Sequence, residues 1–252
     1  MLRYEGLMHR PLLIVLATAA LPAASIAQSD DRAAERELMV LTVANQVATS
    51  GARAGREVRP AVLDAMRRVP RHLFVPEEVR RDAYRAQPLP IGHEATLSAP
   101  LIVALMTELL DARPGDRVLE VGTGSGYQAA VLSGLVRELW SIEIVEPLAR
   151  SAAARLAALG YANVTVRAGD GYAGWPEQAP FDRIIVTAAA EHVPAPLVAQ
   201  LRPGGRMVIP VGVGDVHELV LIAKDRRGRV SRRSILPVRF VPLTRAAEER
   251  GR

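Results

Sequence analysis

The chain has 252 residues, of which 49% are hydrophobic and 23% charged, and its formal net charge is +5. This length suits one large domain with an extension, and the hydrophobic fraction excludes an intrinsically disordered chain. Cysteine is absent, which excludes disulfides, thiolate metal sites and cysteine nucleophiles.

The N-terminus has the pattern of an export signal. Arg3 and Arg10 precede the apolar run PLLIVLATAAL, and Ser25 and Ala27 are small residues of the kind that a signal peptidase reads. The run is about half of the ~20 residues that a membrane-spanning helix needs. We therefore expect residues 1–27 to be a signal peptide cleaved after Ala27, and the protein to be periplasmic without a stable membrane span. An uncleaved anchor is the alternative, and an unused signal would leave the protein in the cytoplasm.

Residues 28–110 are predicted to form a helical extension that carries a substrate-site segment. Helices are expected over residues 28 to about 50, 60–68 and about 100–110, the last two beginning with proline. The apolar residues at helical spacing in the first of these are Leu38, Leu41, Val43 and Val47.

From residue 111 to 245 the pattern alternates between buried strands and helices. Short apolar runs predict parallel strands at 116–122, 138–146, 163–170, 181–189 and 202–212. Two further segments, 217–225 and 229–243, alternate in hydrophobicity around a charged turn and predict antiparallel strands. The sequence therefore predicts an α/β fold: a doubly wound, mostly parallel, Rossmann-like sheet with an N-terminal helical extension and antiparallel C-terminal strands. Residues 246–252 are expected to be a tail.

Arginines gather around the turn between the last two predicted strands: Arg226, Arg227, Arg229, Arg232 and Arg233. Such a cluster can attract nucleic acid or acidic substrates. A solvated hairpin around this turn is the favoured interpretation, and we expect no nucleic-acid partner.

The run VLEVGTGSGYQAAVL places a glycine-rich loop between a strand and a helix. Gly122, Gly124 and Gly126 permit a close approach of ligand to backbone, and the following helix offers free N–H groups. A dinucleotide fingerprint has its third glycine one position later, where this chain has Tyr127. The loop therefore favours a nucleoside ligand without a pyrophosphate over NAD.

Three carboxylates lie at or just after the ends of the next two strands. Glu143 lies 21 residues after Gly122, where an acidic residue accepts both ribose hydroxyls, and Glu146 is the weaker candidate because it precedes Pro147 as a capping residue does. Asp170 is placed to accept a hydrogen bond from an adenine amino group, although Asp-Gly is also a common turn.

These residues resemble a known family. VLEVGTGSGYQAAVLS resembles the S-adenosylmethionine loop of class I methyltransferases. The segments RVPRHLFVPEEVRRDAYRAQPLPIG, SAPLIVALMTELL, GDGYAGWPEQAPFDRIIVTAAA and PVRFVPL are similar to the protein-L-isoaspartate O-methyltransferases. The resemblance covers about Val58 to Leu243.

We expect a monomer that uses no metal. The resemblance implies methyl transfer from S-adenosylmethionine to the α-carboxylate of L-isoaspartyl residues in damaged proteins. The cofactor-binding residues that it implies are Gly122, Thr123, Gly124, Ser125, Gly126, Glu143, Ile144, Asp170 and Gly171. Ser98 matches the family's active-site serine, and Thr96 with Ser98 would bind substrate. From the residues alone, Ser98 is also a candidate N-cap for the helix that begins near Pro100.

Glu94 and Ala95 depart from the Gly-Gln that many bacterial members carry before the threonine. A carboxylate at this place would repel a carboxylate substrate unless it faces solvent or pairs with an arginine. Two alternatives therefore stay open: an exported methyltransferase that acts on another carboxylate, and a cofactor-binding relative without turnover. An NAD-dependent oxidoreductase is disfavoured by Tyr127.

Overall fold

The computed structural model describes residues 32–50 and 57–245. The predicted signal peptide and the predicted tail lie outside the described residues. Among the described residues, no helix combines the length and apolar character that crossing a bilayer requires.

Three helices of the N-terminal region pack on one another: α1 (Ala33–Ser50), α2 (Pro60–Arg68) and α3 (Pro100–Leu110). The predicted bounds of α2 and α3 are confirmed, since proline at the first position fixes where each helix begins. Of the four apolar residues at helical spacing in α1, Leu38 and Leu41 are 66% and 53% exposed. The buried face of α1 consists of Met39, Val40, Val43 and Val47.

The main sheet in the described part of the chain has seven strands, in the order β5-β4-β3-β6-β7-β8-β9. Its strands are β3 (Arg117–Val121), β4 (Glu138–Glu143), β5 (Val164–Ala168), β6 (Phe181–Val186), β7 (Leu201–Val211), β8 (His217–Lys224) and β9 (Val230–Val238). The first five run parallel, and β8 and β9 are antiparallel additions at one edge, as predicted. The connections between the parallel strands contain four helices: α4 (Tyr127–Ser133), α5 (Glu146–Ala158), η3 (Pro176–Gln178) and α6 (Ala195–Gln200).

Hydrophobic side chains cover both faces of this sheet. Successive residues of a strand point to opposite faces, and accordingly Val118 belongs to one buried cluster and Leu119 to the other. The first cluster continues into α1, α2, α3 and α4, and the second into α6. The parallel strands are therefore buried on both sides, which explains their nearly continuous apolar sequences.

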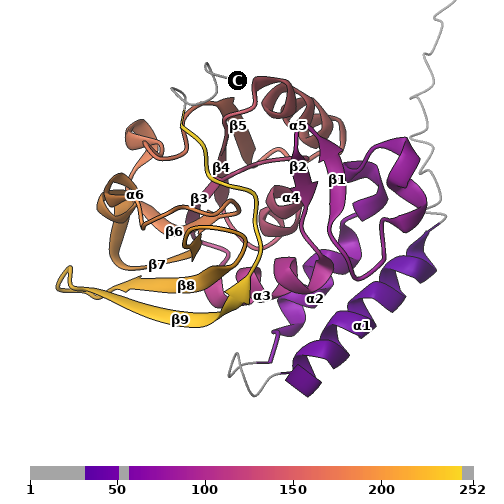
Figure 1. The fold of residues 1–252 in the computed structure, drawn as a ribbon, viewed down its shortest axis with the longest axis horizontal. Helices are drawn as coiled ribbons and strands as arrows, with labels where there is room; N and C mark the ends of the chain where they lie inside the picture. The colour runs from indigo at the N-terminus through magenta and orange to yellow at the C-terminus, as the bar shows by residue number, and fades with distance from the viewer. Residues whose placement is uncertain (1–31, 51–56, 246–252) are drawn as a thin grey trace, which may run out of the picture. The chain divides into compact units, whose positions relative to one another are not determined.

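Between α2 and α3 the chain forms a segment that the sequence did not predict as regular structure. It contains two short 3₁₀ helices, η1 (Arg71–Phe74) and η2 (Glu77–Asp82), and a hairpin of β1 (Leu89–Gly92) with β2 (Ala95–Leu97). His93 and Glu94 form the hairpin turn with φ values of 52° and 56°, so both are left-handed. In Figure 1 this hairpin stands beside α4, facing the yellow segment that follows β9.

The topology fixes where a ligand can bind. The chain passes from β3 outward to β4 and β5 and then returns to the other side of β3 with β6. The carboxyl ends of β3 and β6 therefore form a topological switch point, which is where open α/β sheets bind ligands.

Candidate active site

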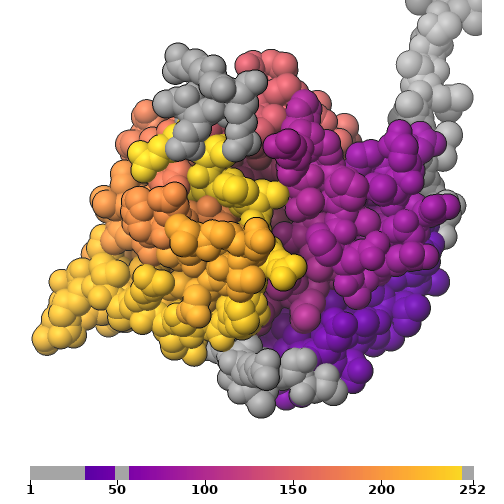
Figure 2. Space-filling model, viewed as in Figure 1, coloured from indigo at the N-terminus to yellow at the C-terminus, as the bar shows by residue number. Residues whose placement is uncertain are grey.

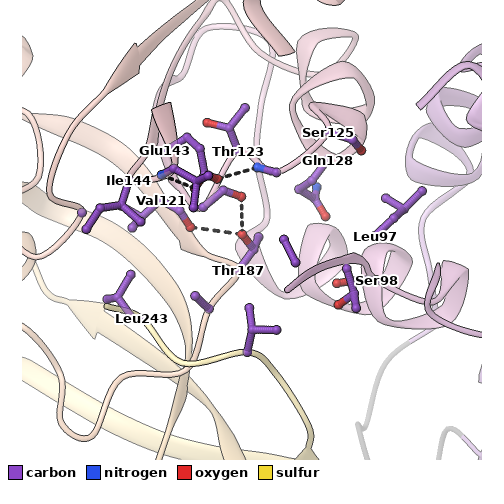
Figure 3. A pocket seen from close by; sticks show the side chains of 18 of the residues that line it. Leu97, Ser98, Val121, Thr123, Ser125, Gln128, Glu143, Ile144, Thr187 and Leu243 are labelled. Atoms are coloured by element: carbon purple, nitrogen blue, oxygen red, sulfur yellow. Dashed lines mark hydrogen bonds between the residues drawn. The ribbon is translucent and has the colours of Figure 1, made fainter. Parts of the chain in front are cut away.

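A cavity of about 650 Å³ opens at this switch point, a volume within the usual range for a small-molecule site. One wall comes from the carboxyl ends of the strands and the opposite wall from residues 93–98 and α3. Residues 241–244, which follow β9, line the same cavity. Figure 2 shows the surface hollowed where this yellow segment meets the magenta hairpin, and Figure 3 shows Leu97 and Ser98 across the cavity from Glu143 and Ile144.

The glycine-rich loop is fixed by contacts that leave no room for a side chain at its first glycine. Gly122 has a φ of 97°, and a Cβ there would lie 2.5 Å from the Thr187 Oγ1. The Thr187 hydroxyl hydrogen-bonds to the carbonyl oxygens of Gly122 at 2.6 Å and Val121 at 3.1 Å. The loop after β3 is thus tied to the end of β6, and glycine is required at its first position.

Glu143 connects the loop to the next strand. Its carboxylate is only 7% exposed and accepts hydrogen bonds from the Gly124 N–H at 2.7 Å and the Val145 N–H at 3.0 Å. An ionised carboxylate has about four acceptor positions. The side chain can therefore hold the loop and also accept hydroxyl donors from a ligand in the cavity that it lines.

A second, fully buried carboxyl group lies behind this wall. Glu120 Oε2 accepts a hydrogen bond from the Ser141 hydroxyl at 2.5 Å, and Ser141 in turn shares a 2.5 Å hydrogen bond with Thr123. Burial raises the pKa of Glu120 to about 8; the charge of Glu143 adds to the shift and the Ser141 hydrogen bond opposes it. The Glu120 carboxyl group therefore keeps its proton at neutral pH.

The opposite wall carries the predicted substrate residues. Thr96 is exposed and Ser98 half-buried, and both line the cavity. The interpretation of Ser98 as a helix cap is wrong: the N-cap of α3 is Ala99, and no side chain caps it. The Ser98 carbonyl oxygen accepts a hydrogen bond from Arg71 Nη2 at 2.7 Å, which leaves the side chain on the cavity side.

The structure brings most of the predicted site residues together around one cavity. Those that line it are Thr96, Ser98, Gly122, Thr123, Gly124, Ser125, Glu143, Ile144 and Gly171. Gly126 and Asp170 are not among the lining residues. Gly126 is the N-cap of α4, and a Cβ there would lie 3.1 Å from the Leu156 side chain; Asp170 Oδ1 accepts a hydrogen bond from the Tyr172 N–H at 2.8 Å. A ligand contact by either residue stays a prediction.

Several lining residues were missed from the sequence. Thr187 follows a buried strand, and that position could have indicated it. Residues 241–243 reach the cavity because Val241 O and Leu243 N hydrogen-bond to the backbone of Ala189, at 2.8 and 2.7 Å. This pairing joins positions that are more than 50 residues apart in the sequence, and no local pattern predicts it.

The site has unsatisfied polar atoms that suit a polar ligand. The hydroxyls of Ser125 and Tyr127 are buried, belong to lining residues, and have no hydrogen-bond partner within the described part of the chain. Buried hydroxyls normally find a partner. Together with the Glu143 carboxylate and the apolar Ile144 and Leu243, they fit a ligand that has hydroxyl groups, an aromatic base and charged ends. Across residues 32–50 and 57–245, no group of three acidic or histidine side chains is placed to hold a metal ion.

Comparisons with known proteins agree with this geometry. Residues 44–248 match the family model described as protein-L-isoaspartate(D-aspartate) O-methyltransferase. A protein-L-isoaspartate O-methyltransferase of Cupriavidus necator is 54% identical over 239 residues, covering 93% of this chain and 92% of the relative. One from Syntrophobacter fumaroxidans is 53% identical, covering 92% and 95%.

Among solved structures, a protein-L-isoaspartate O-methyltransferase matches with a TM-score of 0.72 and 28% identity, over 83% of this chain and 66% of that one. A Plasmodium falciparum structure described as a β-aspartate methyltransferase, in complex with S-adenosyl-L-homocysteine, has a TM-score of 0.68 at 23% identity and covers 83% and 98%. At 23% identity, the match to the Plasmodium falciparum structure shows a similar fold and no more. By family model, by relatives across nearly its whole length and by fold, the chain belongs to the protein-L-isoaspartate(D-aspartate) O-methyltransferase family.

Proposed function

We propose that this chain methylates the α-carboxylate of L-isoaspartyl residues in damaged proteins, with S-adenosylmethionine as the methyl donor. One observation carries the proposal: a single cavity joins the glycine-rich loop and Glu143 to the segment that holds Thr96 and Ser98. A methyl donor and a carboxylate acceptor can therefore meet in one enclosed space. The assignment agrees with the names of the relatives.

The reaction asks little acid–base chemistry of the protein. A carboxylate is ionised at neutral pH, so it needs no general base before it attacks a methyl group. The bound cofactor supplies the electrophilic methyl group on a positively charged sulfur. The protein has to align the two reactants and exclude water from the carboxylate, and buried apolar side chains of the lining, Val103 and Met106 among them, contribute to that exclusion.

Individual residues have separate tasks in this proposal. Glu143 accepts the ribose hydroxyls while it holds Gly124, and Ser125 donates to a polar end of the cofactor. Ser98 donates a hydrogen bond from its hydroxyl to the substrate carboxylate and fixes its direction. Ser98 does not act as a nucleophile, because no basic side chain is hydrogen-bonded to its hydroxyl in the described part of the chain.

The decisive experiment compares two peptides that differ only in their backbone linkage. The protein is incubated with labelled S-adenosylmethionine and with matched peptides that contain isoaspartate or aspartate. We expect base-labile methylation of the isoaspartyl peptide alone. Cofactor binding without transfer to either peptide would contradict the proposal and favour a relative without turnover.

A second acceptor class is motivated by Glu94, which lines the cavity and would oppose binding of the isoaspartyl carboxylate. Transfer to a small carboxylate in preference to the isoaspartyl peptide would support this alternative. The same assay decides it if a set of small carboxylic acids is included.

We also propose that residues 1–27 direct export to the periplasm, with cleavage after Ala27. The charged start, short apolar run and small residues near position 27 support this. N-terminal sequencing of the native protein should give Gln28 as the first residue; an intact N-terminus in the cytoplasmic fraction would contradict it. Because the strand ends, residues 93–98 and residues 241–244 of one chain line the cavity, we further propose that a monomer is active, which light scattering of the active species can test. We also propose that no nucleic acid is required, so nuclease treatment should leave the activity unchanged.

A further inference from the structure

Arg71 is a buried cation at the substrate end of the cavity. Its side chain is 0% exposed. Nε donates to the Ala83 carbonyl oxygen and Nη2 to the Ser98 carbonyl oxygen, each at 2.7 Å. The guanidinium carbon lies 4.8 Å from the ring centroid of Tyr127. One side chain thus connects η1, the end of η2, the segment before α3 and the first residue of α4.

No carboxylate is among the partners of Arg71 within residues 32–50 and 57–245: they are two carbonyl oxygens and an aromatic ring. Arg183 shows the usual arrangement, since it is also buried but has Asp116 at 3.4 Å. A buried charge is costly unless it is paired. Arg71 is therefore an incompletely compensated positive charge.

Two polar atoms at the contact of Arg71 with Tyr127, one from each residue, lack a hydrogen-bond partner among the described residues. Arg71 Nη1 and the Tyr127 hydroxyl are both buried and have no hydrogen-bond partner in the described part of the chain. Tyr127 and Ser98 line the cavity. Burial raises the pKa of Tyr127 to about 12 and the nearby Arg71 opposes the shift, so the phenol stays neutral and offers the guanidinium a polar contact without a negative charge.

We propose that Arg71 is a positioning residue that fixes Ser98 through its backbone carbonyl and supplies the positive potential that holds the substrate carboxylate at this end of the cavity. This inference rests on the proposed function, because that function brings an anion to the Ser98 wall. A charge acts over a longer range in a low-dielectric interior than in water. Arg71 can therefore attract the carboxylate through the wall formed by Ser98 and Tyr127 without touching it.

The inference is tested with Arg71→Met and Arg71→Lys in the full chain. Arg183→Met is the matched control, because it also removes a buried guanidinium but lies on β6, away from the lining residues. We measure kcat and KM for an isoaspartyl peptide, the Kd of S-adenosylhomocysteine and the melting temperature. Arg71→Met should raise KM at least about tenfold while the Kd changes by less than about threefold. Arg183→Met should lower the melting temperature and leave KM unchanged.

The lysine variant adds a pH profile that a purely structural role would not produce. Lysine keeps the charge, so the KM of Arg71→Lys should stay within about threefold of wild type near pH 7. Burial lowers the pKa of a lysine, so this KM should rise relative to wild type between about pH 7 and 9.5. The titratable groups facing the position are Tyr127 and Tyr84, and Tyr84 is hydrogen-bonded to His72 at 2.7 Å. They are common to both proteins, and the ratio of the two profiles removes their contribution.

Several outcomes would overturn the inference. A wild-type KM in Arg71→Met with a lowered melting temperature would make Arg71 purely structural. A parallel loss of S-adenosylhomocysteine affinity would place its effect at the cofactor. If both variants fail to fold, wild type can be tested with an isoaspartyl peptide and its α-carboxamide analogue: the carboxylate should bind at least about tenfold more tightly, and equal binding would contradict the inference. If wild type methylates no isoaspartyl peptide, the proposed function fails instead.

Discussion

The amide nitrogen of Gly124 lies 2.7 Å from the carboxylate of Glu143, so the glycine-rich loop and Glu143 form one hydrogen-bonded unit. Glu143→Ala removes the acceptor of both this hydrogen bond and that from Val145. We expect the Kd of S-adenosylhomocysteine to rise at least about tenfold, with a smaller rise in Glu143→Gln, whose amide oxygen still accepts. Calorimetry checks this. The control is Glu146→Gln on the exposed start of α5, and equal loss in that variant would contradict a specific role for Glu143.

Ser98→Ala separates catalysis from stability because its hydroxyl does not cap α3. We expect kcat for the isoaspartyl peptide to fall about 10- to 100-fold, with the Kd of S-adenosylhomocysteine and the melting temperature nearly unchanged. The matched control is Ser133→Ala, which removes a hydrogen bond to Asn163 and should lower the melting temperature while kcat is kept. A wild-type rate in Ser98→Ala would remove Ser98 from the proposed mechanism.

The central sheet could be predicted because each parallel strand is an apolar run bounded by turn residues, and burial on both faces demands that pattern. The β1–β2 hairpin could not. Its strands are four and three residues long, one contains Pro90, and its turn uses His93 and Glu94 where Asn-Gly would be the usual signal. The prediction that Ser98 caps α3 is wrong because the helix begins at Pro100. Ala99, whose backbone is extended, is therefore the residue directly before the first helical position.

The site was predictable where function follows strand ends and loops. Thr123 and Gly124 come just after β3, and Glu143 is the last residue of β4. Because β3 and β4 pair in parallel, their carboxyl ends lie side by side and bring these residues together. Arg71 was not recognised because its partners, Ala83, Ser98 and Tyr127, are distant in sequence and include backbone oxygens. A side chain that binds main-chain atoms leaves no pattern in the residues that it contacts.

Glu120 gives the protein a pH-dependent stability. Its pKa is about 8 in the folded chain against 4.5 ordinarily, so the folded state binds the proton more tightly than the unfolded state. The contribution is fully present below about pH 4.5 and is lost as the pH rises toward 8, by up to roughly 5 kcal/mol. Glu120→Gln should flatten this dependence in denaturant unfolding measured between these limits. Glu177→Gln, at an exposed site, should retain it, and an unchanged slope in Glu120→Gln would refute the assignment.

Gly122→Ala should destabilise the protein and abolish cofactor binding, because the new Cβ would lie 2.5 Å from the Thr187 Oγ1 and the φ of 97° disfavours any side chain. We expect a loss of roughly 2–4 kcal/mol. Gly228→Ala also has a positive φ but meets nothing within 4 Å, so it should cost only about 1 kcal/mol. Adding Thr187→Ala to Gly122→Ala should recover part of the loss; no recovery would mean that backbone strain dominates.

Glu94→Gln tests whether the carboxylate at the hairpin turn opposes an anionic substrate. We expect kcat/KM for isoaspartyl peptides to rise about two- to fivefold at low ionic strength, and the gain to shrink in salt because exposed charges are screened. The control is Glu138→Gln at the amino end of β4, whereas the cavity lies at the carboxyl ends of the strands. A fall in kcat/KM would instead make Glu94 a substrate-orienting residue.

The backbone pairing of residues 241–243 with Ala189 has a consequence for biosynthesis. One wall of the cavity is made of residues that leave the ribosome almost last among those described, whereas the glycine-rich loop emerges more than 100 residues earlier. A nascent chain that has not released Leu243 has the loop and Glu143 but lacks that wall. We therefore expect tight cofactor binding to be a late event, which would report that synthesis and folding have proceeded past the last strand.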